Sequence, residues 1–269
     1  MKTALTLVTL LCLLPLSMMA QQDTTDAVYL ERVHEYVLNA DASPTYTYSH
    51  KLKLLTPYSF SRAYGESFIT YNPDWQKLEI LRSKTTMRDG QQVESPFNAF
   101  NEVLPRPAAN AAPFSHLKEM VVTHTGVESG AVIDFAYRIH TKAGFMPGLM
   151  GKVVWGDRMH TQHQLLRIKV PVGTDLAVSW VRDRLTGGGP EEVDGMKVYT
   201  HQWANIPQFE FESGQPPLAN MAPVTYFSTS SFSDLAAHAV SPSLDLTLPD
   251  AATEAVKAVM DEHEAPAQR

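Results

Sequence analysis

The sequence is poor in cysteine and in positive charge. Its 269 residues include one cysteine, Cys12, and 22 lysines and arginines against 29 aspartates and glutamates, which gives a net charge of −7. A single cysteine excludes a disulfide framework within the chain. The negative balance argues against a nucleic-acid partner, because nucleic-acid binders neutralise phosphates with clustered lysine and arginine.

Long apolar runs are also scarce, and the one clear run lies at the amino terminus. Residues 5–16 are apolar and follow Lys2, but they are too few for the ~20 residues of a spanning helix. This pattern predicts a secretory signal peptide over residues 1–20, cleaved near Ala20. Lipoprotein anchoring is not expected, because Leu11 precedes Cys12 where a lipobox has a small residue. The mature chain is then periplasmic or secreted, has no stable membrane insertion, and has no thiol to serve as nucleophile or metal ligand.

What the sequence has instead is a repeated two-residue period. Tyr46, Tyr48, His50, Leu52 and Leu54 alternate with polar residues, as in a half-buried strand. Further strands are expected at residues 67–71, 78–87, 117–125, 131–141, 162–170, 175–181, 197–203 and 224–229. Many short strands separated by turns such as Asn72-Pro73-Asp74 and Asp89-Gly90 predict a mainly β, antiparallel sandwich or barrel.

Fewer segments have a helical pattern. Residues 23–39 predict a short N-terminal helix, so that the leader segment, residues 21–44, is partly helical. Residues 233–239 predict one or two helical turns. Asp250 can cap a C-terminal helix that ends before Pro266. The four prolines of residues 95–114 exclude a central strand there and predict an irregular crossing.

Candidate site residues fall in two places. Residues 117–125 and 131–141 are predicted to form a hairpin, which would bring His124 and His140 together near Asp134. This grouping is interpreted either as cross-strand polar pairing or as a catalytic His–Asp pair. Asp74 and Trp75 follow a turn, where Trp75 is either a core anchor or a stacking platform for sugars or peptides. An apolar bend contains Phe145, Met146, Leu149 and Met150. It is equally consistent with a surface that binds a partner and with side chains that close one end of the sandwich.

Metal and cofactor chemistry have little support. His160 and His163 are three positions apart, so on a strand they point to opposite faces and cannot chelate one ion together. The glycines of residues 187–189 are not followed by the Lys-Ser/Thr of a phosphate loop. We therefore expect neither a metal nor a cofactor.

Several segments together resemble a known family. They are YNPDWQKLEI at residues 71–80, Asp89-Gly90, NEVLP at residues 101–105, the stretch 118–151, NIP at residues 205–207, Glu212, Pro216-Pro217 and STSSF at residues 228–232. They are similar to a bacterial family of unknown function that directly precedes transglutaminase-like (papain-superfamily) domains in exported proteins. The resemblance implies an immunoglobulin-like β-sandwich over residues 45–212, a bridge over 213–249, and the helical start of a truncated transglutaminase-like domain over 250–269. The Cys, His and Asp of the family's catalytic part have no counterpart in this sequence.

Three functional classes are therefore open. The first is a non-catalytic extracytoplasmic module, accessory to a transglutaminase-like domain absent from this chain. The second is an independent peptide- or glycan-binding module that uses exposed aromatic residues such as Tyr58, Tyr64 and Trp75. The third is a hydrolase that uses His124 and Asp134.

Export gives the first testable prediction. We expect the exported protein to begin near Gln21, because the charge and length of residues 1–20 fit a cleaved signal. Mass spectrometry of the exported protein measures its amino terminus. An exported chain that retains Met1 would contradict the prediction.

Overall fold

A computed structural model describes residues 25–110, 116–182, 189–210, 212–244, 253–255 and 257–259. The expected signal peptide, the glycines 187 and 188, and most of the expected C-terminal helix lie outside these residues. Residues 253–255 and 257–259 are helical. None of the helices in the described part of the chain has the length and apolar character needed to cross a membrane.

The chain is mainly β, as the two-residue period predicts. The strands are β1 (Ala27–Leu38), β2 (Pro44–Leu54), β3 (Glu66–Tyr71), β4 (Gln76–Thr86), β5 (Gln92–Glu94), β6 (Phe100–Val103), β7 (Lys118–Thr123), β8 (Val132–Thr141), β9 (Met150–Val154), β10 (His160–Pro171), β11 (Ala177–Val181), β12 (Glu191–Val193), β13 (Met196–Ile206) and β14 (Val224–Ser228). The α-helices are α1 (Arg62–Gly65) and α2 (Phe232–Leu244), with short 3₁₀ turns at η1 (Pro57–Phe60), η2 (Phe97–Ala99), η3 (Arg106–Ala108) and η5 (Leu218–Asn220).

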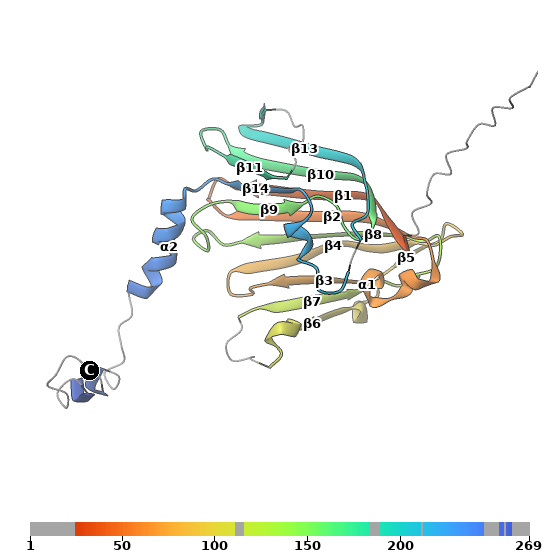
Figure 1. The fold of residues 1–269 in the computed structure, drawn as a ribbon, viewed down its shortest axis with the longest axis horizontal. Coiled ribbons are helices and arrows are strands. Elements are labelled where there is room, and N and C mark those ends of the chain that lie inside the picture. The colour runs from red at the N-terminus through yellow and green to blue at the C-terminus, as the bar shows by residue number, and fades with distance from the viewer. Residues whose placement is uncertain are drawn as a thin grey trace, which may run out of the picture.

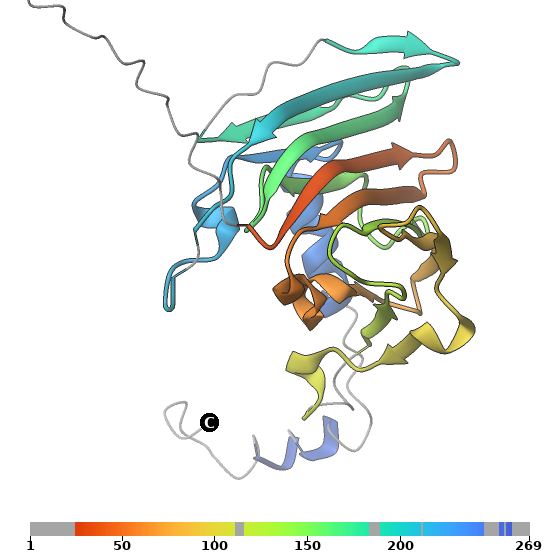
Figure 2. The same cartoon turned by 90° about the vertical axis from the view of Figure 1, so that its right-hand side faces the viewer.

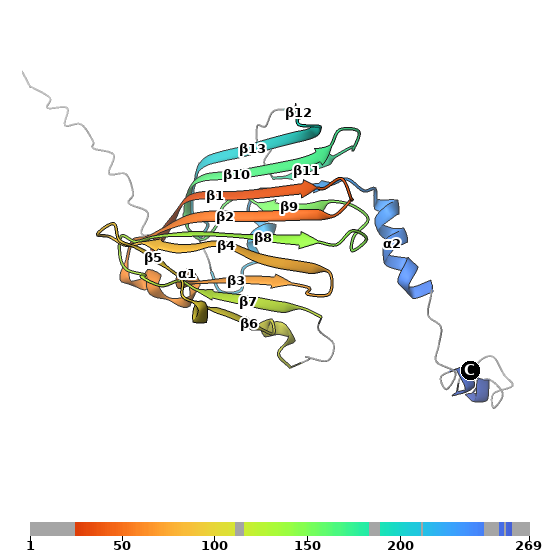
Figure 3. The ribbon, with the colours of Figure 1, turned by 180° about the vertical axis from the view of Figure 1, so that it is seen from behind.

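The strands form one large sheet and two small ones. The eight-stranded sheet has the order β12-β13-β10-β1-β2-β8-β4-β5, and the three-stranded sheets have the orders β11-β14-β9 and β3-β7-β6. The β11-β14-β9 sheet lies over the large sheet near β10, β1 and β2, whereas β3, β7 and β6 lie beyond β4 (Figures 1 and 3). Seen from the side, the large sheet curves towards the β3-β7-β6 sheet (Figure 2). The paired strands run antiparallel except β1 and β10, which are parallel.

The expected N-terminal helix is wrong, because residues 27–38 form strand β1. The helical spacing of Val28, Val33 and Val37 is misleading. The buried face of β1 carries Arg32 and His34, whose polar side chains conceal the two-residue period in the sequence. β1 and β14 lie outside residues 45–212, and both pair with strands inside that range.

The expected hairpin of residues 117–125 and 131–141 is also wrong. Both strands form, but β7 pairs with β3 and β6, and β8 pairs with β2 and β4. Each strand has a partner along both edges, so neither has an edge left for the other. The loop after β7 therefore crosses from a small sheet to the large one.

Two apolar clusters hold the sheets together. The first cluster joins Leu52, Ile133 and Phe135 of the large sheet to Ile69 and Val122 of the β3-β7-β6 sheet. The second joins residues of β1, β10 and β13, such as Leu38, Leu166, Ile168 and Ile206, to Val153 and Phe227 of the β11-β14-β9 sheet. The structure thus has two adjacent cores on one face of the large sheet.

Phe135 tests the first core. Its side chain is 1% exposed and contacts the rings of His50, His124 and Tyr137. We expect Phe135→Ala to lower the free energy of unfolding by about 3–5 kcal/mol, because the change leaves a cavity. Urea unfolding measures the loss, and Phe97→Ala, at a position that is 95% exposed, is the control. Equal stability of the two variants would contradict the assignment.

Candidate functional site

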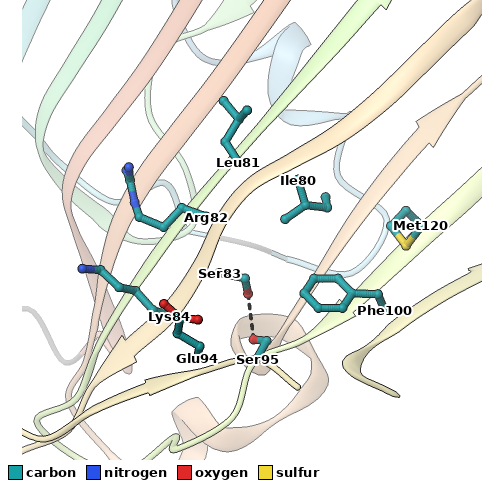
Figure 4. A pocket seen from close by; sticks show the side chains of 9 residues that line it. All are labelled: Ile80, Leu81, Arg82, Ser83, Lys84, Glu94, Ser95, Phe100 and Met120. Atoms are coloured by element: carbon teal, nitrogen blue, oxygen red, sulfur yellow. Dashed lines mark hydrogen bonds between the residues drawn. The ribbon is translucent and has the colours of Figure 1, made fainter. Parts of the chain in front are cut away.

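A pocket of about 420 Å³ lies beside strand β4. It is lined by Ile80, Leu81, Arg82, Ser83, Lys84, Glu94, Ser95, Phe100 and Met120. Figure 4 shows Phe100 of β6 and Met120 of β7 on one side, while Arg82 and Lys84 extend to the other. The pocket forms where β5 stops pairing with β4, since the ladder between them covers only Lys84–Thr86 of β4.

A chain of hydroxyl groups runs from this pocket to the buried His124. The Oγ atoms of Ser95 and Ser83 are 2.8 Å apart, and Ser83 Oγ lies 3.3 Å from His124 Nδ1. On its other side, His124 Nε2 lies 2.9 Å from Ser67 Oγ. Burial lowers the pKa of His124 to about 4, so the ring is neutral at pH 7. His124 thereby connects β3 to β4, which belong to different sheets.

The residues expected beside His124 lie elsewhere. Asp134 Oδ1 accepts a hydrogen bond from Arg82 Nε at 2.7 Å, and His140 Nδ1 lies 3.2 Å from Thr45 Oγ1. The predicted grouping of His124, Asp134 and His140 is therefore wrong. It depended on the β7–β8 hairpin, which does not form.

Asp74 and Trp75 lie in the turn between β3 and β4. The Trp75 ring is 5.6 Å from the Phe145 ring, and the residue is 39% exposed. Lys142 Nζ donates to the Asp74 carbonyl oxygen at 2.6 Å, and Asp74 Oδ2 lies 3.3 Å from His116 Nδ1. These contacts tie the turn to neighbouring loops and leave part of the Trp75 ring accessible.

Tyr58 and Tyr64, which were expected from the sequence to be exposed, do not form one surface with Trp75, and Tyr64 is half-buried. Tyr58 belongs to η1 and Tyr64 to α1, both before β3, whereas Trp75 follows β3. A strand of six residues is about 20 Å long. Trp75 therefore has Phe145 as its aromatic neighbour, not the two tyrosines.

A set of buried polar residues, not predicted as a site, lies in the middle of the large sheet. Arg32 of β1 pairs with Asp157, its Nη1 lying 3.2 Å from Oδ2. His34 Nδ1 lies 2.9 Å from the Tyr46 hydroxyl, and His50 Nδ1 lies 3.2 Å from the Tyr48 hydroxyl. Arg32 and His34 were missed because residues 23–39 were interpreted as a helix. For Tyr46, Tyr48 and His50, the strand alternation of residues 46–54 was the available signal.

These histidines are neutral in the fold. Burial, together with the positive charge of Arg32, lowers the pKa of His34 and His50 to about 3. Two buried nitrogens, His34 Nε2 and Arg32 Nε, have no hydrogen-bond partner among the described residues. Across the same residues, no three His, Cys, Asp or Glu side chains gather closely enough to hold a metal ion.

A family model described as a domain of unknown function with a solved structure (DUF3857) matches residues 40–210. The chain belongs to this family. No curated protein matches the sequence. The DUF3857 match includes β2 to β13, which carry the pocket, His124 and the Trp75 turn.

The chain is similar to a solved protein at 40% identity and remotely similar to others. A chain from Parabacteroides distasonis, described as a candidate protease, is 40% identical with a TM-score of 0.71, over 76% of this chain and 40% of its own. An M1 zinc metallopeptidase from Deinococcus radiodurans is 8% identical, with a TM-score of 0.35 over 74% of this chain and 42% of its own. Yeast LTA4 hydrolase is 9% identical, with a TM-score of 0.34 over 76% and 29%. This DUF3857 chain thus spans less than half the length of each.

Acid sensitivity follows from the buried histidines. The folded pKa values of His34 and His50 lie below the unfolded value of about 6.5, so each contributes stability above pH 6.5 that is lost as the pH falls towards 3. At pH 5.0 the loss is about 2 kcal/mol for each histidine. We expect His50→Gln to flatten the fall in unfolding free energy between pH 7.5 and 5.0, measured with urea. The exposed His163 replaced by Gln is the control, and parallel curves for H50Q and the unchanged protein would contradict the prediction.

Proposed function

We propose that this chain is a non-catalytic, extracytoplasmic β-sandwich module that is accessory to a transglutaminase-like, cysteine-peptidase-like domain. The observation that carries the proposal is the match to the candidate protease, which includes 76% of this chain but only 40% of that protein. The relative therefore has much additional chain beside the shared domain. An accessory domain joined to a catalytic one would give this pattern.

The contacts of the candidate residues support the non-catalytic part of the proposal. His124 has a serine hydroxyl at each ring nitrogen and connects two sheets, while Asp134 is paired with Arg82. A serine hydrolase needs a base that is itself oriented by a third group, usually a carboxylate. The nearest carboxylate suggested by the sequence, Asp134, is engaged on the other side of β8.

A peptide- or glycan-binding module is the second candidate. One observation favours it: the Trp75 ring packs at a tilt against the Phe145 ring, and 39% of the residue's surface is exposed. Partly exposed aromatic rings held in place by a neighbour are suited to stacking on sugars or peptides. This surface would act independently of any catalytic domain.

The main test is an activity measurement on the purified mature chain. We expect no crosslinking and no hydrolysis of glutamine-containing peptides, since the mature chain has no thiol nucleophile. Turnover that resists thiol reagents and is lost in His124→Gln would overturn the proposal in favour of a hydrolase. The melting temperature of the variant must be measured, because His124 also connects the sheets.

The second candidate predicts a different result. Binding of peptides or cell-wall glycan fragments would fall at least tenfold in Trp75→Ala and stay unchanged in Phe97→Ala, an aromatic residue that is more exposed. Titration calorimetry measures both affinities. Equal binding by the two variants would exclude Trp75 as the platform.

A further inference from the structure

An apolar groove of about 490 Å³ lies on the outer face of the β11-β14-β9 sheet, beside α2. Met150 of β9, Ala177 of β11, Tyr226 of β14 and Leu235 of α2 line it, as does the exposed Lys152 of β9. Tyr226 is 42% exposed. Apolar side chains gathered in an open groove indicate a contact surface, because single soluble domains usually bury such groups.

Over residues 231–240, helix α2 is half-buried at two positions. Among residues 231–240, Leu235 and His238 are half-buried and the rest are exposed. His238 Nε2 lies 3.0 Å from the Phe145 carbonyl oxygen, and Ser231 and Asp234 exchange hydrogen bonds at the amino end of the helix. The helix extends away from the sheets in both broad views (Figures 1 and 3).

The exposed side of α2 carries apolar residues. Phe232 is 85% exposed, and Ala236, one turn later, is exposed as well. A helix of 13 residues is only marginally stable in water without tertiary packing. A partner that covers Phe232 would stabilise α2 and remove a large aromatic ring from water.

The position of α2 and the length of a relative favour an additional protein domain as the occupant of the groove. α2 follows closely on β14, and both Tyr226 of β14 and Leu235 of α2 line the groove, so a partner that covers α2 also reaches the groove. The candidate protease with 40% identity has more than half of its chain outside the match. The domain that corresponds to this additional chain is the candidate occupant of the groove.

We propose that the groove and the Phe232 side of α2 form the docking surface for the transglutaminase-like domain. This inference rests on the proposed function. The contacting surface of that domain is apolar, with Phe232 as the anchor and a carboxylate facing Lys152. Aromatic residues are the usual anchors of such interfaces.

Site-specific photocrosslinking tests the proposal with the full chain in cells of the source organism. A benzophenone amino acid replaces Phe232 in one version and Tyr58, which is 78% exposed on η1, in the other. We expect the version at position 232 to crosslink to a transglutaminase-like domain, identified by mass spectrometry, at least tenfold more than the version at position 58. Crosslinking of position 232 to a second copy of this chain would overturn the proposal, as would equal yields at the two positions.

The two proposals fail in different ways. A transglutaminase-like domain captured at position 58 and not at position 232 would refute the groove and leave the accessory role standing. No such domain at either position would refute both. As a second measurement, Phe232→Glu should reduce co-purification of the domain at least tenfold while Tyr58→Glu has no effect. Unchanged melting temperatures would show that both variants fold, as expected for exposed positions.

Discussion

The structure depends on the pairing of β1 with strands from two distant parts of the chain. β1 pairs with β2 on one edge and, in parallel, with β10 on the other, so it joins the β2-β8-β4 half of the large sheet to the β10-β13 half. Each half carries its own apolar cluster with its own small sheet. Without β1 the two cores would have no common sheet. Arg32 strengthens this junction, because its guanidinium reaches both Asp157 and the Gly156 carbonyl oxygen just before β10.

Between the two clusters, polar side chains take the place of aliphatic ones. Arg32, His34, Tyr46, Tyr48 and His50 lie along neighbouring positions of β1 and β2, with rings in contact. Buried polar groups are favourable only when they find partners, and most of these do. Their directional hydrogen bonds fix which residues of β1 face which residues of β2. The register of the two strands is thus specified by geometry as well as by burial.

The sequence predicts strands where the buried face is apolar and fails where it is polar. Residues 46–54 and 131–141 were expected as strands because large aromatic or aliphatic side chains alternate with polar ones along most of each segment, and both are present as β2 and β8. β1 was missed because Arg32 and His34 occupy its inner face. The partners of β7 and β8 could not be predicted, since a five-residue loop with two glycines suits both a hairpin and a crossing between sheets. The crossing forms because β3 pairs with β7 and β4 pairs with β8, and the local sequence of the loop does not encode these distant pairings.

The same failure explains the candidate site. His124 and Asp134 are ten residues apart, so a hairpin would have made them neighbours, and the crossing separates them. His124 instead meets Ser67 and Ser83, two residues with no distinctive signal in the sequence. A neutral histidine between two serines satisfies all of its polar atoms by accepting at one ring nitrogen and donating at the other. This arrangement stabilises the junction of two sheets without requiring a charge.

The Trp75 turn and helix α2, which both contact Phe145, differ in how firmly their exposed aromatic residues are held. At the Trp75 turn, Asp74 and Trp75 are fixed by Lys142, His116 and Phe145. At α2, Phe232 projects from a helix that touches the body through Leu235 and His238. A fixed ring is preorganised for a small ligand, whereas an exposed helix gains packing only from a folded partner. The difference favours the proposal that a macromolecular partner contacts α2, where the chain leaves the sheets.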